Sequence, residues 1–179
     1  MTERPERLHH HAFATRDQEA NRHFVEDILG IPLVATWCER VFRSDVGREV
    51  DYCHTFFEVA DGGALAFFQY ADDDVWEKNK AIFPESGGTW HVAFKVSKPW
   101  LDAAAGRLTK EAIPYRVTDH GYCLSMYTAT PDGLRLEFTV DAPDAAAIAE
   151  MRRKDAHSEL KRWLAGDRRT NNHDRPVHA

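Results

Sequence analysis

Alternating polar and apolar residues near the N-terminus predict a half-buried strand at residues 8–15, read LHHHAFAT. Asp17 then caps a predicted helix whose apolar positions form one stripe, and Gly30 ends it. Three more strands are predicted after this helix, at residues 33–42, 52–59 and 64–70. The pattern therefore predicts a strand, a helix and three strands, in this order.

The same order of elements returns in the second half of the chain. Residues 89–96, read TWHVAFKV, begin it, and aligning His91 on His10 gives the motif His-x-Ala-Phe twice. Ser97 can cap the second helix. The strands predicted after it lie at residues 115–118, 122–128 and 135–140. The chain is therefore interpreted as one structural unit used twice.

A second repeated stretch aligns the ends of the two units. Residues 61–67 and 132–138 superpose without a gap, which makes Glu137 the equivalent of Ala66. The first unit is longer between its two aligned stretches, so it must contain an insertion. We place this insertion in a predicted loop at residues 38–50.

These repeats indicate how the chain is organised. We predict a single domain at residues 8–140, built from modules 8–70 and 89–140. A third helix, at residues 141–166, lies outside both repeats. The polar segment 167–179 is predicted to be disordered.

Composition narrows the class of protein. The chain has 179 residues, of which 43% are apolar, and this is enough for one well-buried domain. The chain has 23 basic and 29 acidic residues, so it lacks the excess of positive charge that is typical of proteins that bind nucleic acid. The three cysteines are widely spaced, and the N-terminus lacks the apolar core of a signal peptide. No run approaches the roughly 20 apolar residues of a spanning helix, so we expect a soluble cytoplasmic protein.

The aligned positions also predict a metal site. If equivalent positions converge on a shared centre, His10, His91 and Glu137 supply two imidazoles and one carboxylate, while Ala66 leaves the fourth place empty. This donor set is typical of the facial triad that holds Fe(II) and keeps other positions open. Glu137 lies in an apolar strand, where an unpaired carboxylate is costly. Its partner is thus a metal or, alternatively, a cation in a structural salt bridge.

Paired strand-helix-three-strand modules with these residues resemble the vicinal oxygen chelate superfamily, which includes glyoxalase I, bleomycin and fosfomycin resistance proteins and extradiol dioxygenases. The resemblance is carried by HHAFAT, ILGIPLV, HVAFKV and TPDGLRLEF. It implies an α+β fold in which two pseudo-symmetric βαβββ modules form a partly open barrel around a divalent metal, with an added C-terminal helix here.

Within that superfamily, three ligands without a fourth look like the extradiol dioxygenases. The resemblance then implies Fe(II), with Mn(II), Ni(II) or Zn(II) also compatible, and a small catechol or vicinal diol cleaved with O2. His120 is expected to assist proton transfer, and Tyr127 to hydrogen-bond the reacting oxygen. A lyase or isomerase of the glyoxalase or epimerase kind is the alternative. A metal-free drug or metabolite binder is the second alternative, and a homodimer is compatible with all three.

Overall fold

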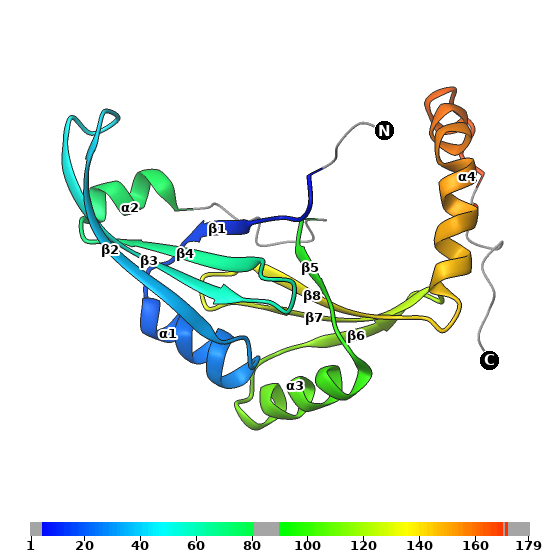
Figure 1. The fold of residues 1–179 in the computed structure, drawn as a ribbon, viewed down its shortest axis with the longest axis horizontal. Coiled ribbons are helices and arrows are strands. Elements are labelled where there is room, and N and C mark those ends of the chain that lie inside the picture. The colour runs from blue at the N-terminus through cyan, green and yellow to red at the C-terminus, as the bar shows by residue number, and fades with distance from the viewer. Residues whose placement is uncertain (1–4, 81–89, 170, 172–179) are drawn as a thin grey trace.

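Two four-stranded mixed sheets form the body of the protein in a computed structural model that describes residues 5–80, 90–169 and 171 (Figure 1). The first sheet has the order β1-β4-β3-β2 and the second β5-β8-β7-β6, so the topology is repeated. The strands of the first sheet are β1 (His10–Ala14), β2 (Leu33–Arg43), β3 (Arg48–Glu58) and β4 (Ala64–Tyr70). The strands of the second are β5 (Val92–Lys95), β6 (Arg116–Asp119), β7 (Cys123–Ala129) and β8 (Arg135–Asp141). The predicted α+β fold of two similar modules is confirmed.

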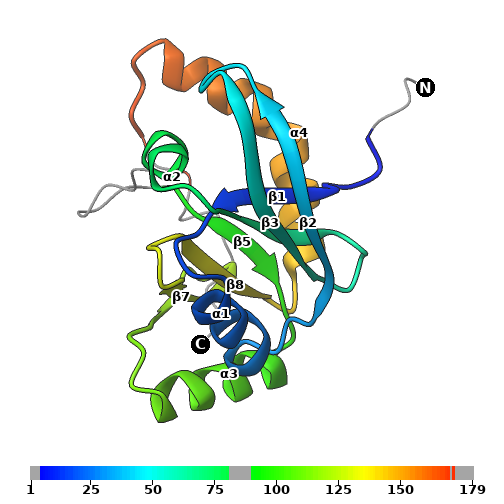
Figure 2. The same ribbon diagram turned by 90° about the vertical axis from the view of Figure 1, so that its left-hand side faces the viewer.

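Two helices, one in each module, begin where the sequence places polar caps. The Asp17 carboxylate accepts hydrogen bonds from the first backbone N–H groups of α1 (Gln18–Arg22), which continues as a π-helix, η1 (His23–Ile28). The Ser97 hydroxyl caps α3 (Lys98–Lys110) in the same way. Figure 2 shows α1 and α3 side by side on the same side of the sheets.

One hydrophobic core joins the two modules. Each sheet turns one apolar face to the helices, and Phe67 of the first sheet and Phe138 of the second belong to the same buried cluster. Arg107 of α3 adds a polar link, because its side chain donates hydrogen bonds to the carbonyls of Ile28 and Leu29. Helices α1 and α3 therefore cover the same side of the two sheets.

The insertion in the first module is strand rather than loop. The strand predicted at residues 33–42 is present as β2, but the loop predicted at residues 38–50 is not, because β2 and β3 continue through it as a long hairpin whose last pair is Arg43 with Arg48. Gly47, at a φ of 70°, allows the tight turn. The polar side chains that suggested a loop pair across the strands, as the Arg40 guanidinium does with the Asp51 carboxylate at 2.6 Å. Cross-strand pairing thus outweighed the polar composition.

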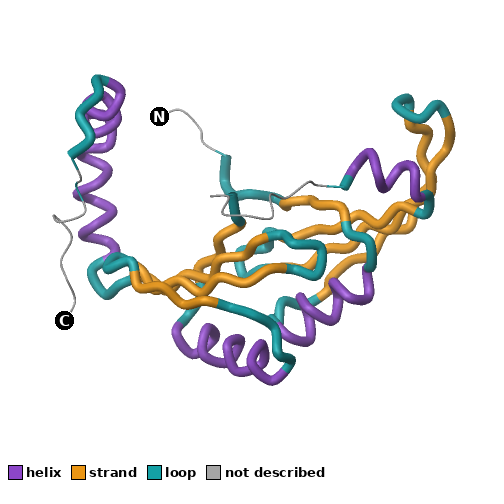
Figure 3. Tube along the Cα trace, turned by 180° about the vertical axis from the view of Figure 1, so that it is seen from behind, coloured by secondary structure: helices purple, strands orange, loops and turns teal. Residues whose placement is uncertain are grey.

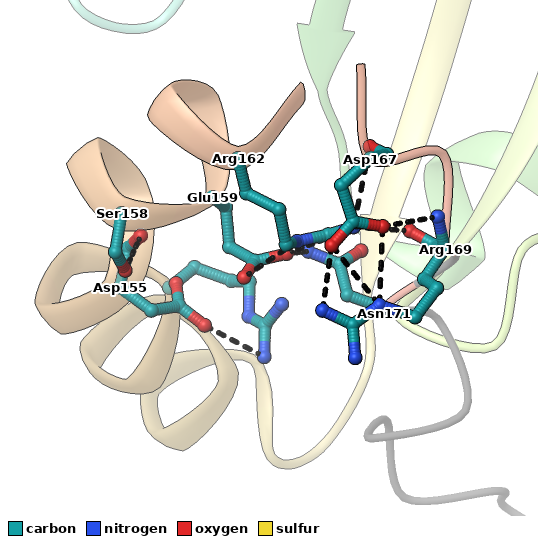
Figure 4. Close-up of polar contacts among 8 residues, drawn as sticks. Asp155, Ser158, Glu159, Arg162, Asp167, Arg169 and Asn171 are labelled. Atoms are coloured by element: carbon teal, nitrogen blue, oxygen red, sulfur yellow. Dashed lines mark hydrogen bonds and ion pairs between the residues drawn. The ribbon is translucent and has the colours of Figure 1, made fainter. Parts of the chain in front are cut away.

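The remaining helices are α2 (Asp73–Asn79) and α4 (Ala145–Leu164). The last of these projects from the body, as Figures 1 and 3 show, and has no buried residue. Ion pairs of Arg162 with Glu159 and Asp167 hold its end in shape (Figure 4). Of the segment predicted to be disordered, residue 170 and residues 172–179 lie outside the described part of the chain.

Within the described residues, no helix is both long enough and apolar enough to cross a membrane.

Candidate metal centre

Strand register brings the predicted site residues of the second module together. Glu137 of β8 lies beside Ala93 of β5 and directly opposite Tyr127 of β7. Because side chains alternate along a strand, Glu137 faces away from Phe138 and the core. The first module pairs Ala66 with Ala12 in the same register, so the predicted equivalence of Ala66 and Glu137 is confirmed.

Both oxygens of the Glu137 carboxylate have partners. The Tyr127 hydroxyl donates a hydrogen bond to Oε1 at 2.8 Å, and Nε2 of His91 lies 2.8 Å from Oε2. Nε2 of His120 lies 2.9 Å from the Tyr127 hydroxyl oxygen. Since the Tyr127 hydroxyl already uses its hydrogen in the bond to Glu137, its oxygen accepts in this contact and His120 donates. The four side chains form one chain of polar contacts.

This environment keeps Glu137 ionised. Its side chain is only 8% exposed, and burial alone would raise its pKa. Hydrogen bonds from Ser125 and Tyr127, with the nearby imidazoles of His91 and His120, outweigh burial and lower the pKa below its ordinary value. Burial, followed by the bond to Glu137, raises the pKa of Tyr127. The pair therefore remains a carboxylate and a neutral phenol at neutral pH.

Ser125 is a site residue that the sequence interpretation missed. It is fully buried in β7, two positions before Tyr127, and its hydroxyl donates to Glu137. The period of two along this strand places both side chains on the same face. That spacing was visible in the sequence, but the register of β7 with β8 was not: it places Tyr127 directly opposite Glu137 and Ser125 opposite Thr139, diagonal to Glu137 on the same face.

His10 lies apart from the other predicted ligands. It is exposed on β1, where its Nδ1 is 2.8 Å from Nδ1 of His9 and its ring is 5.4 Å from that of Phe56. Within the described part of the chain, no three His, Cys, Asp or Glu side chains gather in a way that could hold a metal ion. A single copy thus unites His91 and Glu137 with His120 and Tyr127, but not with His10.

The surroundings of His10 are aromatic, which the sequence analysis did not predict. This aromatic face of the first sheet consists of His10, Tyr52, His54, Phe56, Phe68 and Tyr70. The rings of His54 and Phe68 stack with centroids 3.5 Å apart. Burial, and then the neighbouring His10, lower the pKa of His54, which favours its neutral form. The alternation of Tyr52, His54 and Phe56 was the available signal.

Residues 7–138 match the model of the family described as the glyoxalase/bleomycin resistance protein/dioxygenase superfamily. The chain belongs to this superfamily. Its expected membership, predicted from the duplicated motifs, is therefore confirmed, and the match extends over both modules up to residue 138. The α4 helix lies beyond the match.

Solved structures of this superfamily share the fold at low sequence identity. A domain from Frankia sp. EAN1pec is 17% identical with a TM-score of 0.57, covering 79% of this chain and 95% of that one. Oxidase ChaP-H2 is 20% identical with a TM-score of 0.53, covering 76% and 94%. Fosfomycin resistance protein FosX from Listeria monocytogenes, solved with Mn(II) and sulfate, is 12% identical with a TM-score of 0.52, covering 80% and 99%. None of the curated proteins matches this chain in sequence.

The superfamily includes enzymes that use divalent metals, and the second module provides suitable donors. Nε2 of His91 lies 2.8 Å from Oε2 of Glu137, so the imidazole nitrogen and the carboxylate oxygen point at each other. Tyr127 orients the carboxylate from behind, as outer hydrogen bonds do at metal sites. These residues fit a divalent metal in kind, and His91 and Glu137 would supply two protein ligands to it.

Proposed function

We propose that this protein is a metal-dependent extradiol-type dioxygenase that cleaves a small catechol or vicinal diol with O2. Its metal ligands are His10, His91 and Glu137. The observation that carries the proposal is the meeting of His91 and Glu137 beside Tyr127 and His120. With Ala66 at the equivalent position of the first module, three protein ligands leave the rest of the metal open to substrate and O2.

The third ligand comes from a second copy of the chain in this proposal. His10 is exposed on the open face of the first sheet, and His91 is exposed at the edge of the second. Pairing the first sheet of one copy with the second sheet of another brings an unused imidazole to a two-ligand site. A symmetric homodimer then contains two such sites.

Fe(II) is the proposed metal, because a redox-active ion can bind both a diol and O2; Mn(II) has the same ligand preferences. The protein contributes placement and proton movement. Glu137, held by Tyr127 and Ser125, is fixed as an anionic ligand. His120, hydrogen-bonded to Tyr127, takes or returns a proton at a substrate hydroxyl oxygen, and the pair orients that oxygen.

A lyase or isomerase of the glyoxalase or epimerase kind is the second candidate. The similar fold of a fosfomycin resistance protein solved with Mn(II) supports it, because a Lewis acid without redox change suffices for that chemistry.

Metal analysis followed by oxygen uptake tests the proposal. Protein purified without air is analysed for metals and then mixed with a panel of catechols and non-aromatic diols. Iron together with substrate-dependent oxygen uptake supports the dioxygenase. Manganese, nickel or zinc without uptake supports the second candidate, and protein that binds none of these metals contradicts both.

Mixing two variants tests the shared site. His10→Ala and His91→Ala are each expected to lose metal. After the two variants are unfolded and refolded together, random pairing restores about a quarter of the wild-type sites, because one of two sites in each mixed dimer is intact. Refolding each variant alone is the control. If mixed dimers form and no metal binding is recovered, ligand sharing is contradicted. The identity of the metal and the reaction are tested separately, by metal analysis and oxygen uptake.

A further inference from the structure

Two of the three cysteines face each other across the long hairpin. Cys38 of β2 and Cys53 of β3 are direct partners in the antiparallel register, and both are free thiols. Directly opposed residues in such a pair have Cα atoms about 4.5 or 5.5 Å apart. Disulfides accept Cα separations of about 4.4 to 6.8 Å. The backbone therefore already has the spacing that a bond between these residues requires.

The pair lies on the side of the sheet opposite the aromatic face. Cys53 sits between Tyr52 and His54, whose rings belong to that face, so alternation directs its thiol to the other side. A surface hollow of about 590 Å³ is lined by both cysteines and by Arg40 and Asp51, and Tyr52 and Tyr70 of the aromatic face also border it. Small oxidants can reach the thiols through this hollow without passing the metal centre.

The two thiols differ in exposure. Cys38 is exposed, whereas Cys53 is half-buried. Burial raises the pKa of Cys53, and the Cys38 thiol, which hydrogen-bonds with it, raises it further. Oxidation-sensitive cysteine pairs commonly combine an accessible thiol with a neighbouring one that resolves it. Cys38 is thus suited to react first and Cys53 to react second.

We propose that Cys38 and Cys53 form a site of reversible oxidation by hydrogen peroxide. The Cys38 thiolate attacks one peroxide oxygen, the O–O bond breaks, and the departing hydroxide takes up a proton to leave as water. The Cys53 sulfur then attacks the Cys38 sulfenic sulfur, its S–O bond breaks, and a second water leaves. Two thiols lose two hydrogens to form one disulfide, and the peroxide is reduced to two waters.

The disulfide would restrain the part of the first sheet that carries the aromatic face. It joins β2 to β3 directly behind Tyr52 and His54, which line the aromatic face with His10. Neither cysteine contacts the His91 and Glu137 centre, so this inference does not depend on the proposed function.

Thiol counting and peptide mapping test the site. The full-length reduced protein is treated with hydrogen peroxide, alkylated after unfolding and digested. We expect free thiols to fall from three to one, a cross-link between the Cys38 and Cys53 peptides, and full recovery with dithiothreitol. Cys123→Ser is the matched control, because its thiol is buried on the other sheet, and it should form the same cross-link.

Single variants separate the two roles. Cys53→Ser should stop at the Cys38 sulfenic acid, which dimedone traps, while the wild type yields little of this adduct. Cys38→Ser should keep both remaining thiols over the same period. A cross-link to Cys123, a disulfide joining two chains, or wild-type protein that accumulates the dimedone adduct without a cross-link would overturn the proposal.

Discussion

The two modules have the same strand order and different chemistry on the faces of their sheets that point away from the core. In the second sheet, Tyr127 lies opposite Glu137, whereas the matching pair in the first sheet is Phe56 opposite Ala66. The first sheet therefore lacks the hydroxyl and the carboxylate at this position, although the strand register is the same. Both modules have the apolar face that the shared core needs, while the other face is polar around Glu137 in the second module and aromatic in the first.

The first prediction concerns the shared core, where the modules should behave alike. Phe67→Ala and Phe138→Ala remove register-equivalent, fully buried rings from one cluster. Each is expected to lower the free energy of unfolding by about 3 to 5 kcal/mol. Urea unfolding of metal-free protein, followed by both tryptophan fluorescence and circular dichroism, measures this. Both variants should unfold in a single transition; a separate transition for one module would show that the core is not shared.

The second prediction concerns the carboxylate that distinguishes the modules. Glu137→Gln removes the charge but keeps the shape, so metal occupancy should fall by at least about tenfold with little loss of stability. Metal analysis of protein purified without air measures the occupancy. Glu39→Gln is the matched control, because Glu39 accepts a hydrogen bond from Tyr52 on the first sheet and is exposed. Full metal retention in Glu137→Gln would contradict the ligand assignment.

The third prediction separates the hydroxyl of Tyr127 from the metal ligands. Tyr127→Phe makes the second module resemble Phe56 of the first and removes the links to Glu137 and His120. Metal should remain, while kcat with the best diol should fall by about a hundredfold if proton transfer uses this link. Steady-state oxygen uptake measures kcat, and Tyr52→Phe is the control. An unchanged kcat would remove Tyr127 from the chemistry.

The two repeated sequence stretches made the fold predictable. The differences between the modules limited how much of the candidate metal centre could be predicted. His-x-Ala-Phe and the aligned strand ends fixed equivalent positions such as Ala66 and Glu137, and the register bears them out. The meeting of His120 with Tyr127 depends on how β6 and β7 pair, which spacing along the chain does not determine. His10 illustrates a different limit, because its proposed role as a ligand requires a second copy of the chain, and the sequence of one copy does not show how two copies would pack.

The long hairpin of the first module was the main error in the predicted fold, and its cause is physical. The segment 38–50 contains many charged side chains, and each of them, taken alone, favours a solvated loop over a strand. Paired across β2 and β3, they stabilise the ladder instead, as Arg40 does with Asp51. A sequence shows the charges but not their partners, so the hairpin could not be told from a loop.

The smallest expected effect tests this hairpin, which has no counterpart of equal length in the second module. The hydrogen bond from Arg40 lowers the pKa of Asp51 below its ordinary value of 3.8. A lowered folded-state pKa stabilises the protein above 3.8, and this contribution disappears as the pH falls through the folded value. Asp51→Asn should therefore lose less stability than the wild type on acidification below 3.8, with a small difference because both side chains are exposed. Urea midpoints measured above and below that pH give the difference, and Asp102→Asn, in an exposed helical pair with Lys98, is the control for a general loss of charge. Equal acid sensitivity of the wild type and Asp51→Asn would mean that the cross-strand pair does not stabilise the hairpin in solution.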